Sequence, residues 1–310
     1  VGLIGSNWGG TRIEPWTTLA GFESVPELAD IAKKVKGYKA DTRVGGSSPS
    51  AIYNSMVHPL TPFAMRGAIW YQGESNGGEH MSYYHKKHAL VNGWRKAFQN
   101  KDLGFYWVQL ANFRQPNKNP AGGDGWAKIR EAQTKALDIP HTGMAVAIDL
   151  ADAHNPNDIH PRNKQVVGRR LARLALARDY GIKIPHESPR FKSMEIRDDK
   201  AIISFDHVSG GLYSFDSNDP IGFAISGEDR QFVWAEARIL GKHQVEVWAE
   251  SIKSPVAVRY AWVNNQPPAA ELASAHRPKK PQPTKTSKLN AEVARAKLAP
   301  PDAKPDWKMN

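Results

Sequence analysis

The run from Ala68 to Asn76, Ala-Ile-Trp-Tyr-Gln-Gly-Glu-Ser-Asn, restricts the fold of this chain more than any other stretch. Ile69, Trp70 and Tyr71 are β-branched or aromatic, which is typical of a buried strand, and Gly73 then interrupts that strand. The polar side chains that follow are Gln72, Glu74, Ser75 and Asn76. In open α/β sheets, ligands bind outside the carboxyl ends of the strands. Strand ends are also polar simply because they reach water, so this run alone leaves both a ligand site and an ordinary strand end open.

The first 183 residues alternate between short apolar runs and helical patterns. The predicted strands are 1–5, 67–71, 103–111 and 143–150, and the predicted helices are 81–98, 126–137 and a segment from Pro161 to about Tyr180. A further helix is predicted to open at Ser24, with Glu27 as its capping-box partner. Strand, loop and helix in repetition predict a parallel sheet that is covered on both faces.

After Pro185 the hydrophobic period changes to short alternating segments separated by Gly, Asn and Asp. We therefore expect an antiparallel β-rich region over residues 184–268, next to an α/β domain over residues 1–183. Residues 269–310 form a basic, proline-rich tail. The tail from His276 onward carries a net charge of +6 out of +11 for the chain, but almost no large apolar residues. We expect this tail to be a solvated extension rather than a nucleic-acid site.

Composition excludes several classes of protein. The chain has no cysteine, which rules out disulfides, thiolate zinc sites and a cysteine nucleophile. No run of eighteen apolar residues occurs, so no membrane span is predicted. The histidines at 80, 85, 88, 154 and 160 match no zinc-binding spacing, and no metal is expected. Residues 1–4 have the composition of a core strand, and no polar segment precedes them in the sequence. We therefore expect a further segment upstream.

Asp158 and His160 form the most reactive pair in the sequence. They are two residues apart, so in an extended segment both side chains project to the same side. An aspartate beside an imidazole is the pair that activates a hydroxyl nucleophile, because the carboxylate fixes the tautomer while the imidazole takes and returns the proton. A helix cap at Asp158 and a surface histidine at 160 would have the same spacing. Near the amino terminus, Gly9 and Gly10 leave backbone N–H groups free to bind an anion.

Taken together, three motifs resemble the sialate O-acetylesterases, a family of the SGNH hydrolases. They are residues 2–16 (GLIGSNWGGTRIEPW), residues 66–76 (RGAIWYQGESN), and residues 158–164 (DIHPRNK) followed by 168–172 (GRRLA). The resemblance extends through the β-rich region and covers about residues 1–265. It implies a flavodoxin-like three-layer α/β/α fold with a C-terminal β-rich region.

The resemblance also implies a serine esterase that removes acetyl groups from sugar hydroxyls through an acyl-enzyme, without metal or organic cofactor. His160 would be the general base and Asp158 its orienting acid, while Glu74 competes with Asp158 for that role. A backbone N–H near Gly9 or Gly10 and the side chain of Gln72 or Asn76 would form the oxyanion hole.

One departure from the family pattern concerns the nucleophile. The family carries its serine in a Gly-Gln-Ser-Asn-Met block upstream of the first motif, and this chain contains no such block. Either the serine lies on an upstream segment or separate chain, or Ser6 has taken over its role. Ser75 is a weaker choice, because a nucleophile placed among the oxyanion donors could not also be addressed by them.

The functional predictions are therefore a sialic-acid O-acetylesterase, an acetylxylan esterase, or a catalytically silent glycan-binding protein. The expected partners are an acetylated carbohydrate and the protein's own amino-terminal segment, with no nucleic acid and no membrane. The family resemblance implies a secreted or periplasmic protein.

Overall fold

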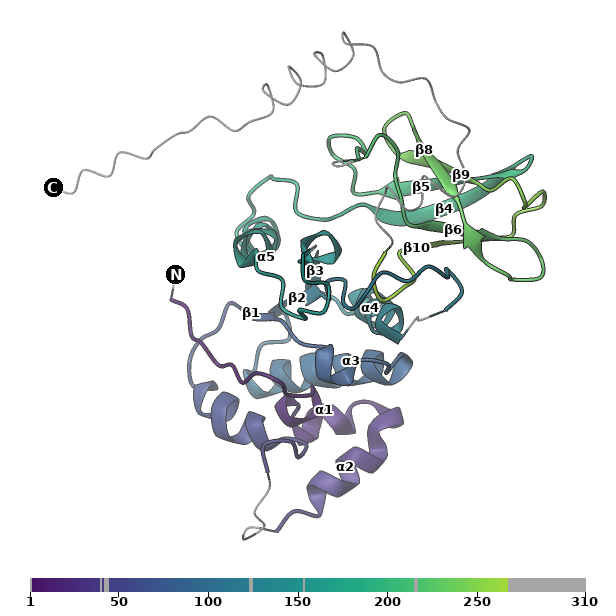
Figure 1. Cartoon of the computed structure of the whole chain (residues 1–310). Helices are drawn as coiled ribbons and strands as arrows, with labels where there is room; N and C mark the ends of the chain where they lie inside the picture. The colour runs from purple at the N-terminus through teal and green to yellow at the C-terminus, as the bar shows by residue number, and fades with distance from the viewer. Residues whose placement is uncertain are drawn as a thin grey trace, which may run out of the picture. The chain divides into compact units, whose positions relative to one another are not determined.

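A computed structural model describes residues 2–39, 41, 45–122, 125–152, 154–214 and 217–266 (Figure 1). The chain divides by its internal contacts into two units, Val1–Ala269 and Ala270–Asn310. The predicted basic tail, residues 269–310, lies outside the described residues. No helix in the described ranges combines the length and the apolar character needed to cross a membrane.

The first sheet contains three parallel strands in the order β1-β2-β3. They are β1 (Gly67–Trp70), β2 (Gly104–Gln109) and β3 (Thr142–Val146). Helices α3 (Met81–Ala97) and α4 (Gly125–Lys135) cover one face, and α5 (Lys164–Arg178) covers part of the other (Figure 1). Along β2 the side chains alternate: Phe105 and Trp107 pack towards α3 and α4, whereas Tyr106 and Val108 pack towards α5. This arrangement confirms the predicted three-layer α/β/α fold.

Two predictions about the edge of the sheet formed by β1 are wrong. The predicted strand at residues 1–5 is wrong, because residues 2–8 form no strand and Leu3 is 91% exposed. The expected burial of Ile69 is also wrong: this residue is 66% exposed. Ile69 lies on the same face as its neighbour Tyr106, but α5 packs on β2 and β3. One edge and one face of β1 are therefore uncovered within the described residues.

A group of short helices precedes β1. They are a 3-10 turn (Glu14–Trp16), α1 (Leu19–Glu23), a 3-10 turn (Pro26–Leu28), α2 (Ala29–Lys36), a π-helical turn (Tyr53–Val57) and a 3-10 turn (His58–Leu60). The predicted helix start at Ser24 is wrong, because Ser24 ends α1. The N-cap of α1 is Thr18, whose Oγ1 accepts a hydrogen bond from Gly21 N at 2.8 Å. Gly21 also lets α1 approach α3 closely, since a Cβ there would lie 2.1 Å from Ala89 O.

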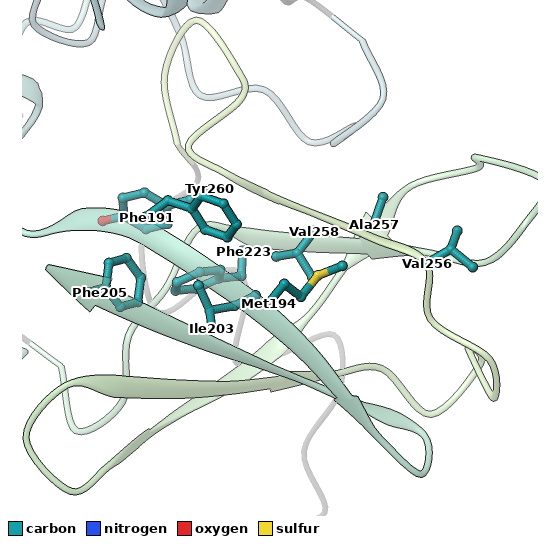
Figure 2. Close-up of a pocket in the computed structure, with 9 residues that line it drawn as sticks. All are labelled: Phe191, Met194, Ile203, Phe205, Phe223, Val256, Ala257, Val258 and Tyr260. Carbon is teal, nitrogen blue, oxygen red and sulfur yellow. The ribbon is translucent and has the colours of Figure 1, made fainter. Parts of the chain in front are cut away.

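The second half is antiparallel, as the alternating pattern predicts. One sheet has the order β4-β5-β9-β8 and the other has the order β10-β6-β7. The strands are β4 (Arg190–Arg197), β5 (Lys200–Asp206), β6 (Phe223–Ser226), β7 (Val233–Trp234), β8 (Glu236–Leu240), β9 (Gln244–Trp248) and β10 (Ala257–Tyr260). An apolar groove of about 350 Å³ opens between the sheets, with Met194, Ile203 and Phe223 among its lining residues (Figure 2). The predicted boundary at residues 183/184 falls between α5 and β4.

Candidate active site

The polar run after β1 forms a tight loop at the carboxyl end of the strand. Residues Glu74–Asn76 make a 3-10 turn, and Gly73 precedes it. A Cβ at Gly73 would lie 2.9 Å from Gln133 Nε2, so the close approach of this buried amide requires glycine. Gln133 in turn donates to the carbonyl oxygen of Gln72 at 3.2 Å. Gln133 on α4 therefore holds the backbone of this loop in place.

The amides of Gln72 and Asn76, predicted as oxyanion donors, are both buried in this loop. Asn76 is 0% exposed; its Oδ1 accepts from Ile13 N at 3.0 Å and from Gln72 Nε2 at 2.7 Å, and its Nδ2 donates to Glu14 at 3.2 Å. Gln72 Nε2 also donates to Thr11 O at 3.1 Å. Each amide nitrogen therefore already donates within the protein. In this arrangement the two side chains hold the loop against residues 11–14.

An ionic cluster around the buried Glu14 and Lys86 also connects residues 12–14 to the loop. Lys86 Nζ donates to Glu14 Oε1 at 2.8 Å and to Glu79 Oε2 at 2.6 Å, and Arg12 pairs with both glutamates. Burial raises the pKa of Glu14, but hydrogen bonds from Arg12 and Lys86 outweigh it and lower the pKa to about 2. Glu14 is therefore ionised at neutral pH. Sequence reasoning missed this cluster, because its members are up to 74 residues apart and only the fold brings them together.

Gly9 and Gly10 form an exposed turn beside the loop. Gly10 has a φ of +72°, a conformation that favours glycine. Ser75 Oγ donates to Gly10 O at 3.0 Å, and Arg12 Nη1 donates to Ser75 O at 2.9 Å, so the turn is clasped to the loop. Across the described ranges, the backbone N–H groups of Gly9 and Gly10 donate no hydrogen bond. These two donors remain available to an oxyanion.

His160 and Asp158 lie in the segment before α5. Asp158 Oδ1 accepts a hydrogen bond from the backbone N–H of His160 at 2.9 Å and lies 3.6 Å from its Nδ1. The second distance is an ion-pair distance rather than a hydrogen bond. The imidazole is 78% exposed, as a group that acts on an external substrate requires. The prediction that Pro161 starts the helix is wrong: α5 begins at Lys164, where Asn163 caps it by accepting from Val166 N at 3.1 Å.

Glu74 shares this end of β1 with His160. Burial raises the pKa of Glu74, whereas backbone N–H groups of the loop and the charges of His160 and Lys164 lower it in part. Lys164 Nζ donates to Pro161 O at 2.6 Å and lies 5.5 Å from the centre of the Tyr71 ring. Glu74, His160 and Lys164 thus interact electrostatically. Lys164 was not among the predicted site residues, although it belongs to the motif that contains His160.

The two serines considered as nucleophiles are bonded elsewhere. Ser6 Oγ is 3.5 Å from Met56 O, and Ser75 Oγ is bonded to Gly10 O. Within the ranges that the structure describes, neither hydroxyl is hydrogen-bonded to His160. The same ranges contain no group of three or more His, Asp or Glu side chains arranged to hold a metal ion.

Comparison with known proteins identifies the class to which this fold and loop belong. Residues 1–177 match the model of a carbohydrate esterase family, the sialic acid-specific acetylesterases. The chain therefore belongs to this family, and the predicted family is confirmed.

Individual relatives agree with this assignment. The chain is 31% identical to human sialate O-acetylesterase over 281 residues, which is 84% of this chain and 52% of the relative. It is 32% identical to the rat sialate O-acetylesterase over 234 residues, which is 63% of this chain and 43% of that protein. A crystal structure of a carbohydrate acetylesterase from Xanthomonas citri superposes with a TM-score of 0.71 at 37% identity, covering 84% of this chain and 55% of that one. The chain thus spans about half the length of these relatives.

Proposed function

We propose that this protein removes acetyl groups from sugar hydroxyls, with sialic acid as the sugar. The observation that supports the proposal is the interaction of the exposed His160 with Asp158 and with Glu74. The loop that contains Glu74 is also bonded to the glycine turn at Gly9 and Gly10. Membership of the sialic acid-specific acetylesterase family supports the substrate class. An acetylated plant polysaccharide such as xylan is the alternative substrate, because the similar Xanthomonas citri protein is a carbohydrate acetylesterase.

The proposed reaction is acyl transfer through serine. The serine Oγ attacks the acetyl carbonyl carbon while His160 takes the hydroxyl proton, and the Gly9 and Gly10 N–H groups stabilise the oxyanion. When the C–O bond to the sugar breaks, His160 returns the proton to the sugar oxygen. Water then attacks the acyl-serine by the same route and releases acetate. Asp158 orients His160 through its backbone and its ring, and Glu74 stabilises the imidazolium.

We propose that the serine lies on polypeptide outside these 310 residues. Neither Ser6 nor Ser75 is bonded to His160, and the relatives are about twice as long as the match. The uncovered edge and face of β1 give such a segment a place to add to the sheet, since parallel strands are normally buried on both faces. Because acetylated glycans occur mostly outside the cytoplasm, we also propose a secreted or periplasmic location.

The test is labelling with a fluorophosphonate, which forms a covalent adduct with an activated serine, followed by intact mass and peptide mapping. We expect no adduct on residues 1–310 alone, and one adduct with aryl-acetate hydrolysis when the protein is extended at its amino terminus. An adduct on Ser6 would instead place the nucleophile within this chain. If the extended protein bound acetylated sialic acid but gave neither adduct nor hydrolysis, it would be a silent glycan-binding protein and the esterase proposal would be wrong.

A further inference from the structure

A second groove, of about 710 Å³, lies in the β-rich region and is lined by both polar and apolar side chains. Among its lining residues are Lys192, Ser193, Ser204, Lys242, His243 and Gln244. They come from β4, β5, the turn between β8 and β9, and the first residue of β9. None belongs to the loop that contains Glu74 or to the segment that contains His160. The volume is within the range of ligand sites in proteins.

The backbone around this groove is fixed. The β8–β9 turn contains Gly241 with a φ of +58°, and two of its carbonyl oxygens accept hydrogen bonds: Lys242 O from Leu212 N and His243 O from Phe205 N, each at 2.9 Å. Gln244 Nε2 donates to Ser204 Oγ at 3.0 Å across the strands. Ser204 Oγ accepts this bond, so its hydroxyl proton can be donated to a ligand.

A β-bulge places a cation in the groove. The register of β4 against β5 shifts between Phe191 and Ser193, which leaves Lys192 as the extra residue. Lys192 Nζ reaches Asp206 Oδ1 at 2.9 Å, on the face of β5 that also carries Ser204. Lys242 and His243 form no ion pair within the ranges that the structure describes. Two lysines therefore face one aspartate, which leaves an excess of positive charge beside hydroxyl and amide groups.

We propose that this groove binds the carboxylate and hydroxyl groups of an acidic sugar residue, as a second glycan-binding site. Lys242 pairs with the carboxylate, and Ser193, Ser204 and Gln244 exchange hydrogen bonds with the sugar hydroxyls. The choice of a carbohydrate rests on the proposed function, whereas the choice of an acidic one rests on the lysines of the groove. Such a site would hold a sialylated chain on the protein independently of hydrolysis.

The test uses sialic acid and its methyl ester, which differ in the carboxylate charge, with backbone-amide NMR to locate binding. We expect sialic acid to shift resonances of residues 192–193, 204–207 and 240–244. Lys242→Gln should weaken binding about tenfold, the effect of losing one charge-assisted contact. The matched control Lys253→Gln removes the same charge from an exposed position of the β-rich region that does not line the groove, and should leave binding unchanged.

Each other outcome overturns the proposal. Equal binding of acid and ester would show that the carboxylate is not recognised. Shifts confined to residues around His160 and Glu74 would place the only sugar site at the proposed active centre. Binding of heparin but not of sialic acid, with a steep salt dependence, would make the groove a general polyanion surface. In the protein extended at its amino terminus, Lys242→Gln should leave aryl-acetate hydrolysis unchanged, so failure of this site and failure of the esterase proposal are distinguishable.

Discussion

Glu74, in the loop after β1, and Glu14, which is bonded to that loop, have pKa values shifted in opposite directions. Glu14 lies between Lys86 and Arg12, and its pKa is lowered to about 2. Burial raises the pKa of Glu74, which lies near the exposed His160. Two acids whose environments separate their pKa values have different tasks. Glu14 is part of the structure that holds the loop, whereas Glu74 faces the side where chemistry is proposed.

The comparison explains how the loop can be both rigid and reactive. On the Glu14 side, buried amides and ion pairs fix the backbone of residues 72–76 and the glycine turn. On the Glu74 side, the His160 side chain is exposed, but its backbone is held in place because Asp158 accepts a hydrogen bond from its N–H. We expect substitutions on the first side to change stability and substitutions on the second side to change activity.

The largest effect is expected for His160→Ala. Removing a general base lowers the rate by about 10²–10⁴-fold. The measurement is the hydrolysis of an aryl acetate by the protein extended at its amino terminus. The thermal midpoint should hardly change, because the imidazole is exposed. His154→Ala, which removes an exposed histidine from the same segment, is the control and should keep full activity. Full activity in His160→Ala would contradict the assignment of the base.

Glu14→Gln should have the largest effect on stability. It leaves the buried Lys86 with one partner fewer, and breaking a buried pair typically costs about 3–5 kcal/mol of unfolding free energy. Glu23→Gln is the control: it removes one partner of an exposed pair with Lys36 and should cost about 0–1 kcal/mol in urea unfolding. Equal losses in the two variants would contradict a stabilising role for the buried pair of Glu14 and Lys86.

The pH dependence of the same variant sharpens this test. The pKa of Glu14 is about 2 in the folded protein, below its ordinary 4.5, so its stabilising contribution is complete above pH 4.5 and is lost as the pH falls towards 2. Glu14→Gln lacks this contribution at every pH. The difference between wild type and variant should therefore narrow over that interval, and a constant difference would assign the effect to packing instead.

Lys86 and Lys87 are adjacent lysines, and in the described ranges only Lys86 of the two has carboxylate partners. Lys87 is 0% exposed and has no hydrogen-bond acceptor within the described residues; its Nζ lies 5.1–5.4 Å from the ring centres of Trp70, Tyr83 and Trp107. Burial lowers the pKa of Lys87 well below its ordinary value. Lys87→Met should therefore raise the unfolding free energy at pH 7 by about 1–2 kcal/mol. Lys86→Met should lower it, because Glu14 and Glu79 would keep only the more exposed Arg12 as a cation.

The sign of the Lys87 effect can be checked by pH. Because the folded-state pKa is lowered, the unfolded chain binds the proton more readily, and wild-type stability should rise with pH up to the ordinary value of 10.5. Lys87→Met should lack this rise. If both proteins had the same pH profile, the three aromatic rings would be holding Lys87 as a cation.

Sequence reasoning could select candidate site residues because they lie in continuous motifs. The run that contains Glu74 follows a predicted strand that the structure contains, at the carboxyl edge of the parallel sheet. The run that contains Gly9 is predicted to follow a strand at residues 1–5, which does not form, and it is joined to the loop by the hydrogen bond from Ser75 to Gly10 instead. The partners of buried charges were not predictable in this way. Nothing in the spacing of Glu14 and Lys86 pairs them, and Lys87 has the same residue type as its neighbour in a different environment. The exposure of Ile69 could not be predicted from its residue type. A strand is buried on both faces only when helices or other strands cover both faces of the sheet, and α5 packs on β2 and β3 rather than on β1.

The smallest change in unfolding free energy is expected for Ile69→Thr. This substitution also tests whether an added segment covers β1. In these 310 residues Ile69→Thr should change the unfolding free energy by no more than about 0.5 kcal/mol, as for other surface positions, because both residues are β-branched and Ile69 is 66% exposed. The control Val108→Thr, on the same face of the next strand and 0% exposed, should cost about 1–3 kcal/mol. In protein extended at its amino terminus, the cost of Ile69→Thr should rise towards that of Val108→Thr. A cost that stayed near zero would show that the added segment does not cover β1, and the serine would then have to reach His160 from another side.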